Sequence, residues 1–318
     1  MKTTSILLVP ALLSGCILLE DGKITETCDE LGTCDGISSG GIVFAAKSES
    51  EARWSASVLD GLGDELNPAI SRDGQGEGLG PIVYNDSNDT IYINIGESLR
   101  TLKTAGGTEK ISGIPPLSDG IPIGDNAVFV FEGDNSAGSL PGFLWAEDDQ
   151  ATIIPWPIPQ SKPVAIFPSS HSNDDASTSI QSFAVLFHTS NKIPSIAEFE
   201  ANTDMGTISE TQNGGITNFD SMNGRSIDAF TIEDGYATCA ATGAIFLVDD
   251  LLANNTDPSR YNAALPGGDV IACDYEEETE LVVLFSEDGS ISWMTAQNEI
   301  VRSIKGTDGY RIVHGSTW

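Results

Sequence analysis

The sequence predicts an all-β fold, and three observations support this prediction. Segments rich in apolar and β-branched residues recur along the chain, and turn-forming Asp-Gly pairs interrupt several of them. No long segment repeats apolar residues every 3.6 positions, as an amphipathic helix would. The chain also contains 33 glycines and 15 prolines, which is typical of many short strands joined by tight turns.

The clearest hairpin covers residues 281–293, where an apolar run leads through Glu287, Asp288 and Gly289 into Ile-Ser-Trp. Asp-Gly supplies the positive φ that a tight turn between two strands requires. Residues 227–239 repeat this pattern, including the Glu-Asp-Gly turn, 54 positions earlier. The two copies predict a repeating architecture.

Six such hairpins begin at residues 42, 91, 127, 183, 227 and 281, at intervals of 49, 36, 56, 44 and 54 residues. These intervals are typical of β-propeller blades, whose four-stranded units recur about every 40 to 50 residues. A strand led by glycine or proline precedes most hairpins, at residues 80–84, 163–167, 215–219 and 268–273, with a weaker example at 121–124. We expect these segments to be the inner strands, because close packing around the axis leaves little room for side chains.

The hairpin at Ile42 has no such strand before it, whereas residues 309–315 have the form of an inner strand and no hairpin after them. We therefore expect the C-terminal strand to pair with the first blade and to close a six-bladed propeller without a free edge. Seven blades would follow if residues 140–155 formed a further unit. Residues 248–255 predict one helical turn. Over residues 42–318 the repeat pattern resembles that of WD40-like and YVTN-like β-propellers.

The N-terminus resembles the signal of a bacterial lipoprotein. Lys2 is followed by an apolar run at residues 6–13 that is too short to span a bilayer. Leu13, Ser14, Gly15 and Cys16 match the lipobox. The resemblance implies that residues 1–15 are removed and that acylated Cys16 anchors the protein to the lipid bilayer. Because Ile17 rather than aspartate follows the cysteine, the resemblance favours the outer membrane.

Residues 16–41 are polar and acidic, and we expect them to form a tether below the propeller domain at residues 42–318. Four cysteines remain besides Cys16, and an even number in an exported chain indicates two disulfides. Cys28 and Cys34 flank only five residues and are expected to pair with each other. Cys239 would then pair with Cys273.

The chain carries 47 acidic and 15 basic residues, for a formal net charge of −32. Such a surface repels phosphate backbones, so nucleic acid is excluded as a partner. It also repels anionic lipid head groups, so the lipid anchor would supply the attraction to the membrane. The acidity itself is typical of a protein kept soluble in a salty medium.

Motifs with catalytic chemistry are scarce. The sequence has no G-x-S-x-G, its arginines are scattered, and its histidines, His171, His188 and His314, lie far apart. Residues 286–293 resemble the Asp-box of sialidase-type propellers, but the glycine comes one place early, which favours a plain hairpin turn. Acidic loops at residues 85–89, 172–175 and 276–278 offer the oxygen ligands that calcium uses, without the D-x-D-x-D-G order of a dedicated loop. We interpret them as solvated turns.

These observations favour a monomeric, non-catalytic binding or scaffold module that presents its loops to a protein or a glycan. The alternative is a metal-dependent hydrolase, lactonase-like or glycosidase-like, with its site on the propeller axis. An envelope assembly factor is a third reading and would require an apolar groove. Bound calcium and buried carboxylates in the central channel would favour the hydrolase, because propellers support both binding and catalysis.

Overall fold

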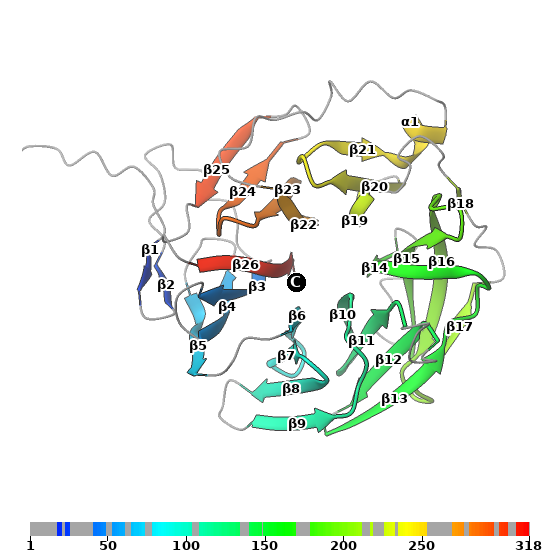
Figure 1. Ribbon diagram of the computed structural model, residues 1–318, viewed down its shortest axis with the longest axis horizontal. Helices are drawn as coiled ribbons and strands as arrows, with labels where there is room; N and C mark the ends of the chain where they lie inside the picture. The colour runs from blue at the N-terminus through cyan, green and yellow to red at the C-terminus, as the bar shows by residue number, and fades with distance from the viewer. Residues whose placement is uncertain are drawn as a thin grey trace, which may run out of the picture.

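The computed structural model describes residues 18–20, 23–25, 41–48, 53–60, 65–73, 78–103, 108–133, 140–147, 149–169, 179–211, 217–218, 226–232, 235–252, 269–276, 280–295, 299–304 and 310–317. Six antiparallel sheets stand around a common axis (Figure 1). The predicted all-β, six-bladed propeller is therefore confirmed.

The first blade joins the two ends of the propeller. Its sheet has the order β26-β3-β4-β5, with β26 (Tyr310–Thr317) as the inner strand and β3 (Gly41–Ser48) beside it. In this antiparallel pair, Thr317 lies opposite Ile42 and Tyr310 opposite Ser48. β4 (Arg53–Asp60) and β5 (Glu65–Asp73) complete the blade. The predicted closure is confirmed, and Figure 1 shows the C-terminus near the centre of the ring.

The next three blades follow one another along the chain. The second contains β6 (Leu79–Asn85), β7 (Thr90–Ile95), β8 (Ser98–Lys103) and β9 (Thr108–Ser112). The third contains β10 (Asp119–Ile123), β11 (Asn126–Phe131), β12 (Gly142–Glu147) and β13 (Gln150–Pro155). The fourth contains β14 (Ser161–Pro168), β15 (Ile180–Thr189), β16 (Pro194–Asn202) and β17 (Thr207–Glu210). Residues 140–155 thus supply the outer strands of the third blade and not a seventh blade.

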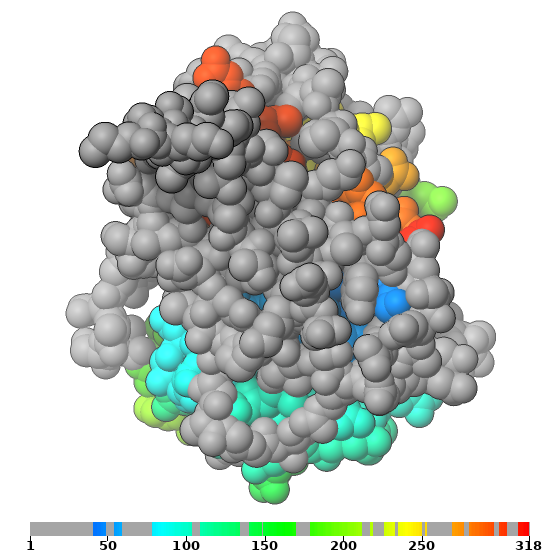
Figure 2. Space-filling view, turned by 90° about the vertical axis from the view of Figure 1, so that its left-hand side faces the viewer, coloured from blue at the N-terminus to red at the C-terminus, as the bar shows by residue number. Residues whose placement is uncertain are grey.

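The last two blades complete the ring. The fifth contains β19 (Ser226–Ile232), β20 (Gly235–Ala240) and β21 (Ile245–Leu247), followed by the short helix α1 (Val248–Leu252) in the predicted place. The sixth contains β22 (Val270–Glu276), β23 (Leu281–Ser286), β24 (Ile291–Met294) and β25 (Ile300–Ile304). Figure 2 shows one side of the ring, with the first blade in blue between the second in cyan and the sixth in orange.

The prediction of the strand order in the fifth blade is wrong. The Glu-Asp-Gly hairpin of residues 227–239 joins β19 to β20, the first and second strands, whereas that of residues 281–293 joins β23 to β24, the second and third. The expected inner strand at residues 215–219 is instead β18 (Thr217–Asn218), which pairs with β16 of the fourth blade. The local pattern is ambiguous because a tight turn joins any two antiparallel neighbours.

Apolar side chains fill the spaces between blades. Phe143 packs against Phe183 and Phe199 between the third and fourth blades, with ring centroids 5.9 and 5.2 Å apart. Phe44 and Phe285 lie in one buried cluster between the first and sixth blades. A β-carbon at Gly315 would lie 2.3 Å from the Phe285 ring, so this position of the inner strand requires glycine.

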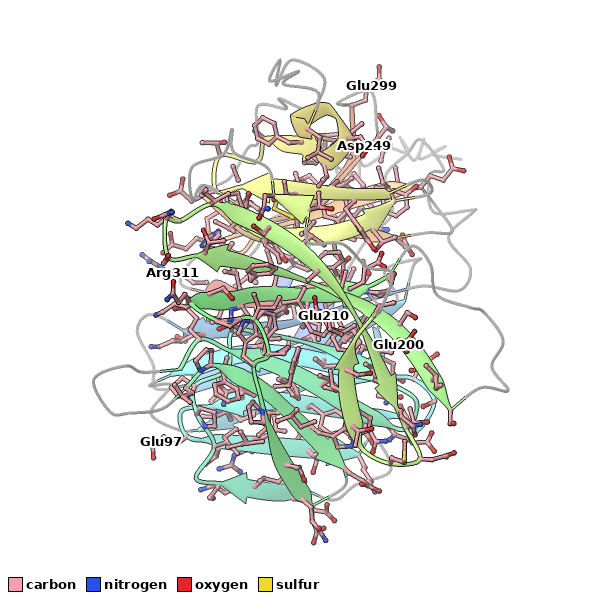
Figure 3. The ribbon with its side chains drawn as sticks, turned by 90° about the vertical axis from the view of Figure 1, so that its right-hand side faces the viewer. Glu97, Glu200, Glu210, Asp249, Glu299 and Arg311 are labelled. Carbon is pink, nitrogen blue, oxygen red and sulfur yellow. A yellow bond between two sulfur atoms is a disulfide. The ribbon has the colours of Figure 1, made fainter. Side chains whose placement is uncertain are left out.

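Outside the ring, β1 (Leu18–Glu20) and β2 (Lys23–Thr25) form a small hairpin, which the polar composition of residues 16–41 did not predict. In the described part of the chain we find no helix with the length and hydropathy of a membrane span. Figure 3 shows acidic side chains such as Glu97 and Glu299 at the periphery of the propeller.

Candidate ligand site on the propeller axis

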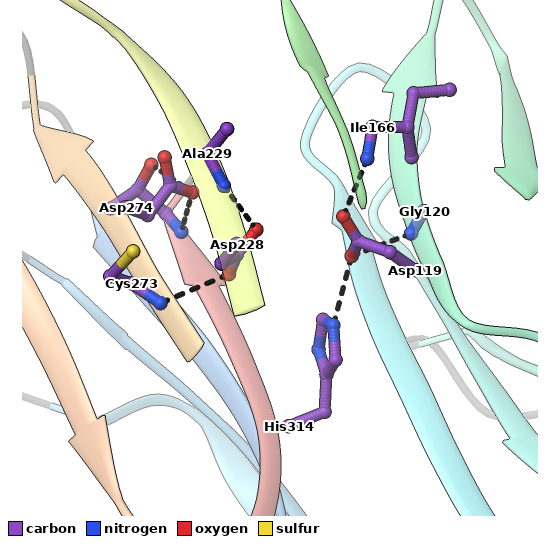
Figure 4. A network of polar contacts seen from close by, with 9 residues as sticks. Asp119, Gly120, Ile166, Asp228, Ala229, Cys273, Asp274 and His314 are labelled. Carbon is purple, nitrogen blue, oxygen red and sulfur yellow. Dashed lines mark hydrogen bonds and ion pairs between the residues drawn. The ribbon is translucent and has the colours of Figure 1, made fainter. Parts of the chain in front are cut away.

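A cavity of about 420 Å³ lies where the inner strands converge. Its walls come from β10, β14, β19, β22 and β26, so five of the six blades contribute to it. Three aspartates line it, and each comes from a different blade: Asp119, Asp228 and Asp274. All three are buried or nearly so. Figure 4 shows them facing a common space with His314.

Asp119 begins β10 and connects three blades. Its Oδ1 accepts a hydrogen bond from the backbone N–H of Gly120 at 2.8 Å, and its Oδ2 accepts one from Ile166 of β14 at 2.8 Å. The Nε2 atom of His314, on β26, lies 2.9 Å from Oδ1. Because a carboxylate accepts hydrogen bonds, Nε2 carries the proton, and in a neutral ring Nδ1 is then an acceptor. Nδ1 is buried without a hydrogen-bond partner among the described residues.

Asp228 of β19 repeats this arrangement between the fifth and sixth blades. Its two oxygens accept hydrogen bonds from the backbone N–H groups of Ala229 at 2.8 Å and Cys273 at 3.0 Å. The register shifts at a β-bulge between Ser226 and Asp228. A similar shift lies between Ile312 and His314 of β26. Because a bulge redirects the side chains that follow it, these irregularities help to place Asp228 and His314.

Asp274 of β22 connects the sixth blade to the C-terminal strand. Its Oδ1 accepts a hydrogen bond from the N–H of Tyr275 at 2.8 Å. Its Oδ2 accepts two from Thr317, from the N–H at 2.8 Å and from the hydroxyl at 2.9 Å. Each aspartate therefore binds the N–H of the next residue and an N–H of the following blade, and holds two blades together around the cavity.

Burial and mutual repulsion make this site electrostatically costly. Burial raises the pKa of Asp228 well above its ordinary value, and the charges of Asp119 and Asp274 raise it further, against the opposing effect of the N–H bonds from Cys273 and Ala229. Burial also raises the pKa of Asp274, although the hydrogen bonds from Thr317 and Tyr275 lower it. The ionised forms of Asp228 and Asp274 are thus disfavoured in this cavity.

The remaining lining is largely apolar and aromatic. Phe167 is buried and Tyr275 is partly buried, and both line the cavity. Within the described residues, no group of three His, Cys, Asp or Glu side chains is placed to hold a metal ion. Carboxylates and aromatic side chains thus line the same cavity.

Among the other sequence-predicted residues, Cys273 and Glu276 line the axial cavity and His314 contacts Asp119. Cys239 and Cys273 form the predicted disulfide, which links β20 to β22. Cys16, Cys28, Cys34 and His171 lie outside the described residues. His188 lies near the end of β15, and His314 lies in the closing strand.

Two of the acidic loops can be compared with their interpretation as solvated turns. Residues 86–89 form the turn between β6 and β7, whereas Asn85 is the buried last residue of β6, and its Nδ2 donates hydrogen bonds to the carbonyl oxygens of Gly124 and Asn126 at 2.8 Å each. Glu276 departs from the interpretation, because it is the buried last residue of β22. Residues 172–175 lie outside the described residues. At the Asp-box-like sequence, Asp288 accepts hydrogen bonds from the N–H and hydroxyl of Ser290 within a hairpin turn.

Sequence reasoning missed the three aspartates of the cavity. Asp119 and Asp228 are single acidic residues at the start of or within an apolar inner strand, which is a local signal of their position, whereas Asp274 is followed by the acidic run 276–278 and has no such signal. Their convergence depends on closure of the ring, which joins residues as distant as Asp119 and His314.

The fold and the cavity define the chain as a six-bladed β-propeller with an acidic site on its axis. No protein-family model matches the chain, and no curated protein matches it. Among solved structures, it is similar to the crystal structure of a protein of unknown function from Bacteroides caccae, with a TM-score of 0.49 and 8% sequence identity. The match covers 88% of this chain and 99% of that chain.

Proposed function

We propose that the protein is a non-catalytic binding protein of the cell envelope that holds a small organic cation in its axial cavity. One observation carries the proposal: three buried carboxylates from different blades line a cavity of about 420 Å³. Sites for small molecules usually have volumes of about 300 to 1,000 Å³.

The electrostatics of the cavity support a cationic ligand. Asp228 and Asp274 have raised pKa values because burial and neighbouring aspartates disfavour their ionised forms. An ammonium group would compensate these charges, and the apolar side chains of Phe167 and Tyr275 in the lining would favour its carbon-bound part.

The backbone hydrogen bonds support binding rather than proton transfer. Both oxygens of each aspartate accept N–H groups of the propeller, so the carboxylates are held in position before a ligand arrives. Such preorganisation reduces the conformational entropy lost on binding.

Lipid anchoring through Cys16 is part of the proposal and is supported by the lipobox at residues 13–16. It would keep the propeller at the membrane surface, with the outer membrane favoured. Expression of the Cys16→Ala variant tests it: the variant should lose incorporation of a labelled fatty acid and leave the membrane fraction. Unchanged labelling and fractionation would contradict the anchor.

Isothermal titration with ethylammonium, putrescine and choline tests the ligand class, with ethanol and acetate as uncharged and anionic controls. We expect binding of at least one amine, and at least a tenfold loss of affinity in Asp228→Asn. Asp288→Asn, which removes the same charge from an exposed hairpin turn, should bind as the unsubstituted protein does. Equal binding by both variants, or no response to any cation, would contradict the proposal.

The hydrolase remains a second candidate, because carboxylates on the axis are the feature it requires. Its test uses calcium and manganese chloride with a set of lactones. A melting temperature raised by either ion and lowered by a chelator, together with lactone hydrolysis lost in Asp119→Asn, would favour the hydrolase over the amine-binding protein.

A further inference from the structure

A second cavity of about 680 Å³ lies between the third and fourth blades, away from the aspartates of the axis. Its walls come from the residue after β11, the residues before β12, the start of β14, and the end of β15 with the turn after it. Lys162, His188 and Lys192 line it. Glu132 is the one acidic residue among the described residues of the lining, so the two lysines outnumber it, in a chain that has only 15 lysines and arginines against 47 acidic residues.

The backbone brings these three side chains together. Lys162 of β14 lies directly opposite His188 of β15 in the antiparallel register. Lys192 follows in the turn that begins at Thr189, where its N–H donates to the Thr189 carbonyl at 2.8 Å. Lys192 has a φ of +61°, and Gln160 on the facing loop has a φ of +55°. Side chains other than glycine or asparagine are uncommon in this conformation, and such residues gather at functional sites.

The polar groups of the cavity are incompletely paired within the described residues. The Nε2 atom of His188 is buried and has no hydrogen-bond partner there. The Nζ atom of Lys162 lies 3.4 Å from the Oε2 atom of Glu132, and both side chains are about half exposed. An exposed pair of this kind is weak and can reorganise around a ligand. Buried polar atoms usually have partners, so the His188 nitrogen indicates a place for one.

Leu140, Pro141 and Val164 supply an apolar wall beside these groups, and Leu140 is 73% exposed. A ligand that matches the cavity therefore has a negative end for the lysines and an apolar body for this wall.

We propose that this cavity binds a small organic molecule carrying an oxyanion, with Lys162 and Lys192 facing the negative group, His188 donating a hydrogen bond to it and Leu140 contacting the apolar part. Long-range repulsion from the acidic surface does not prevent such binding, because charges more than about 8 Å apart are largely screened at physiological ionic strength. The site is separate from the axial cavity, so it does not depend on the cation-binding function.

Titration with hexanoate, hexyl sulfate and inorganic sulfate, followed by NMR of the His188 ring, tests this proposal. We expect one or both hexyl ligands to shift the His188 signals, with a dissociation constant at least tenfold below that of inorganic sulfate. The comparison between the two hexyl ligands distinguishes a carboxylate from a sulfate ester. Hexylamine should cause no shift.

Charge-neutralising variants provide the control. The double variant Lys162→Gln, Lys192→Gln should weaken binding by tenfold or more. Lys110→Gln, an exposed lysine of β9 in the second blade, should leave binding unchanged. Leu140→Ser should weaken the hexyl ligands and not inorganic sulfate. Equal weakening by Lys110→Gln and the double variant, or the absence of any His188 shift, would overturn the proposal.

Discussion

Asp274 holds the end of the chain in place, because its Oδ2 atom accepts hydrogen bonds from both the N–H and the hydroxyl of Thr317. Forty-three positions separate the two residues. β26 is the inner strand of the first blade, so this contact joins the sixth blade to the first across the closure of the ring.

Replacement of Asp274 by asparagine should weaken this closure. The amide offers one acceptor where the carboxylate offers two, and its NH₂ group would face a backbone N–H. We expect a loss of about 1 to 3 kcal/mol in the free energy of unfolding, measured in urea, since an unsatisfied buried group costs that much. Asp269→Asn, at an exposed position just before the same strand, should change stability by no more than about 0.5 kcal/mol. Equal effects of the two variants would show that the contact with Thr317 is unimportant.

Deletion of residues 309–318 should have a larger effect than any single substitution. The deletion removes β26, leaves β3 without its inner partner and uncovers part of the cluster around Phe44 and Phe285. Unpaired strand edges promote aggregation. We expect loss of the cooperative thermal transition and sedimentation as large species. An unchanged melting temperature and a monomeric profile would contradict closure by the C-terminal strand.

The buried aspartates predict a stability that rises on mild acidification. The folded-state pKa values of Asp228 and Asp274 lie above the ordinary value of 3.8, so the folded protein binds protons more tightly than the unfolded chain. Stability attributable to these groups therefore increases as the pH falls through their folded-state pKa values towards 3.8. Urea unfolding between pH 8 and pH 4 should show a weaker increase in Asp228→Asn than in the unsubstituted protein.

His188 should change the stability of the protein with pH in the direction opposite to the aspartates. Burial lowers its pKa below 6.5, although Glu132 raises it, so the unfolded chain binds the proton more tightly and stability falls as the pH drops below that value. His188→Gln should remove this loss and leave the contribution of the aspartates in place. If the dependence of stability on pH changed in the same way in Asp228→Asn and in His188→Gln, the opposite effects assigned to these two residues would be contradicted.

The disulfide between Cys239 and Cys273 should stabilise the junction of the fifth and sixth blades. It closes a loop with a sequence separation of 34 residues, for which chain entropy predicts a contribution of about 4 kcal/mol. Mild reduction should lower the urea midpoint accordingly, with alkylated Cys239 and Cys273 identified by mass spectrometry.

A peptide map of the unreduced protein, analysed by mass spectrometry, should also find the predicted link between Cys28 and Cys34. Unmodified thiols at either pair before reduction would refute that pairing.

The sequence was sufficient to predict the ring and its closure, because alternating strands and turn residues are local signals. It was insufficient for the strand order within the fifth blade, because the Glu-Asp-Gly sequence at residues 233–235 is the same whichever two strands it joins. The interpretation of Glu276 as a solvated turn residue failed for a related reason, since the end of β22 is buried by neighbouring strands rather than by its own sequence context.

By itself, the amino-acid sequence predicted the all-β class, a propeller of six blades with seven left open, the C-terminal strand as the closing element and, by elimination, the pairing of Cys239 with Cys273. Only the tertiary structure decided that Asp119, Asp228 and Asp274 share one cavity and that Lys162, His188 and Lys192 surround another. The physical reason is that strand patterns depend on residues a few positions apart, whereas a site on the axis or between blades forms only when the closed ring brings distant strands together.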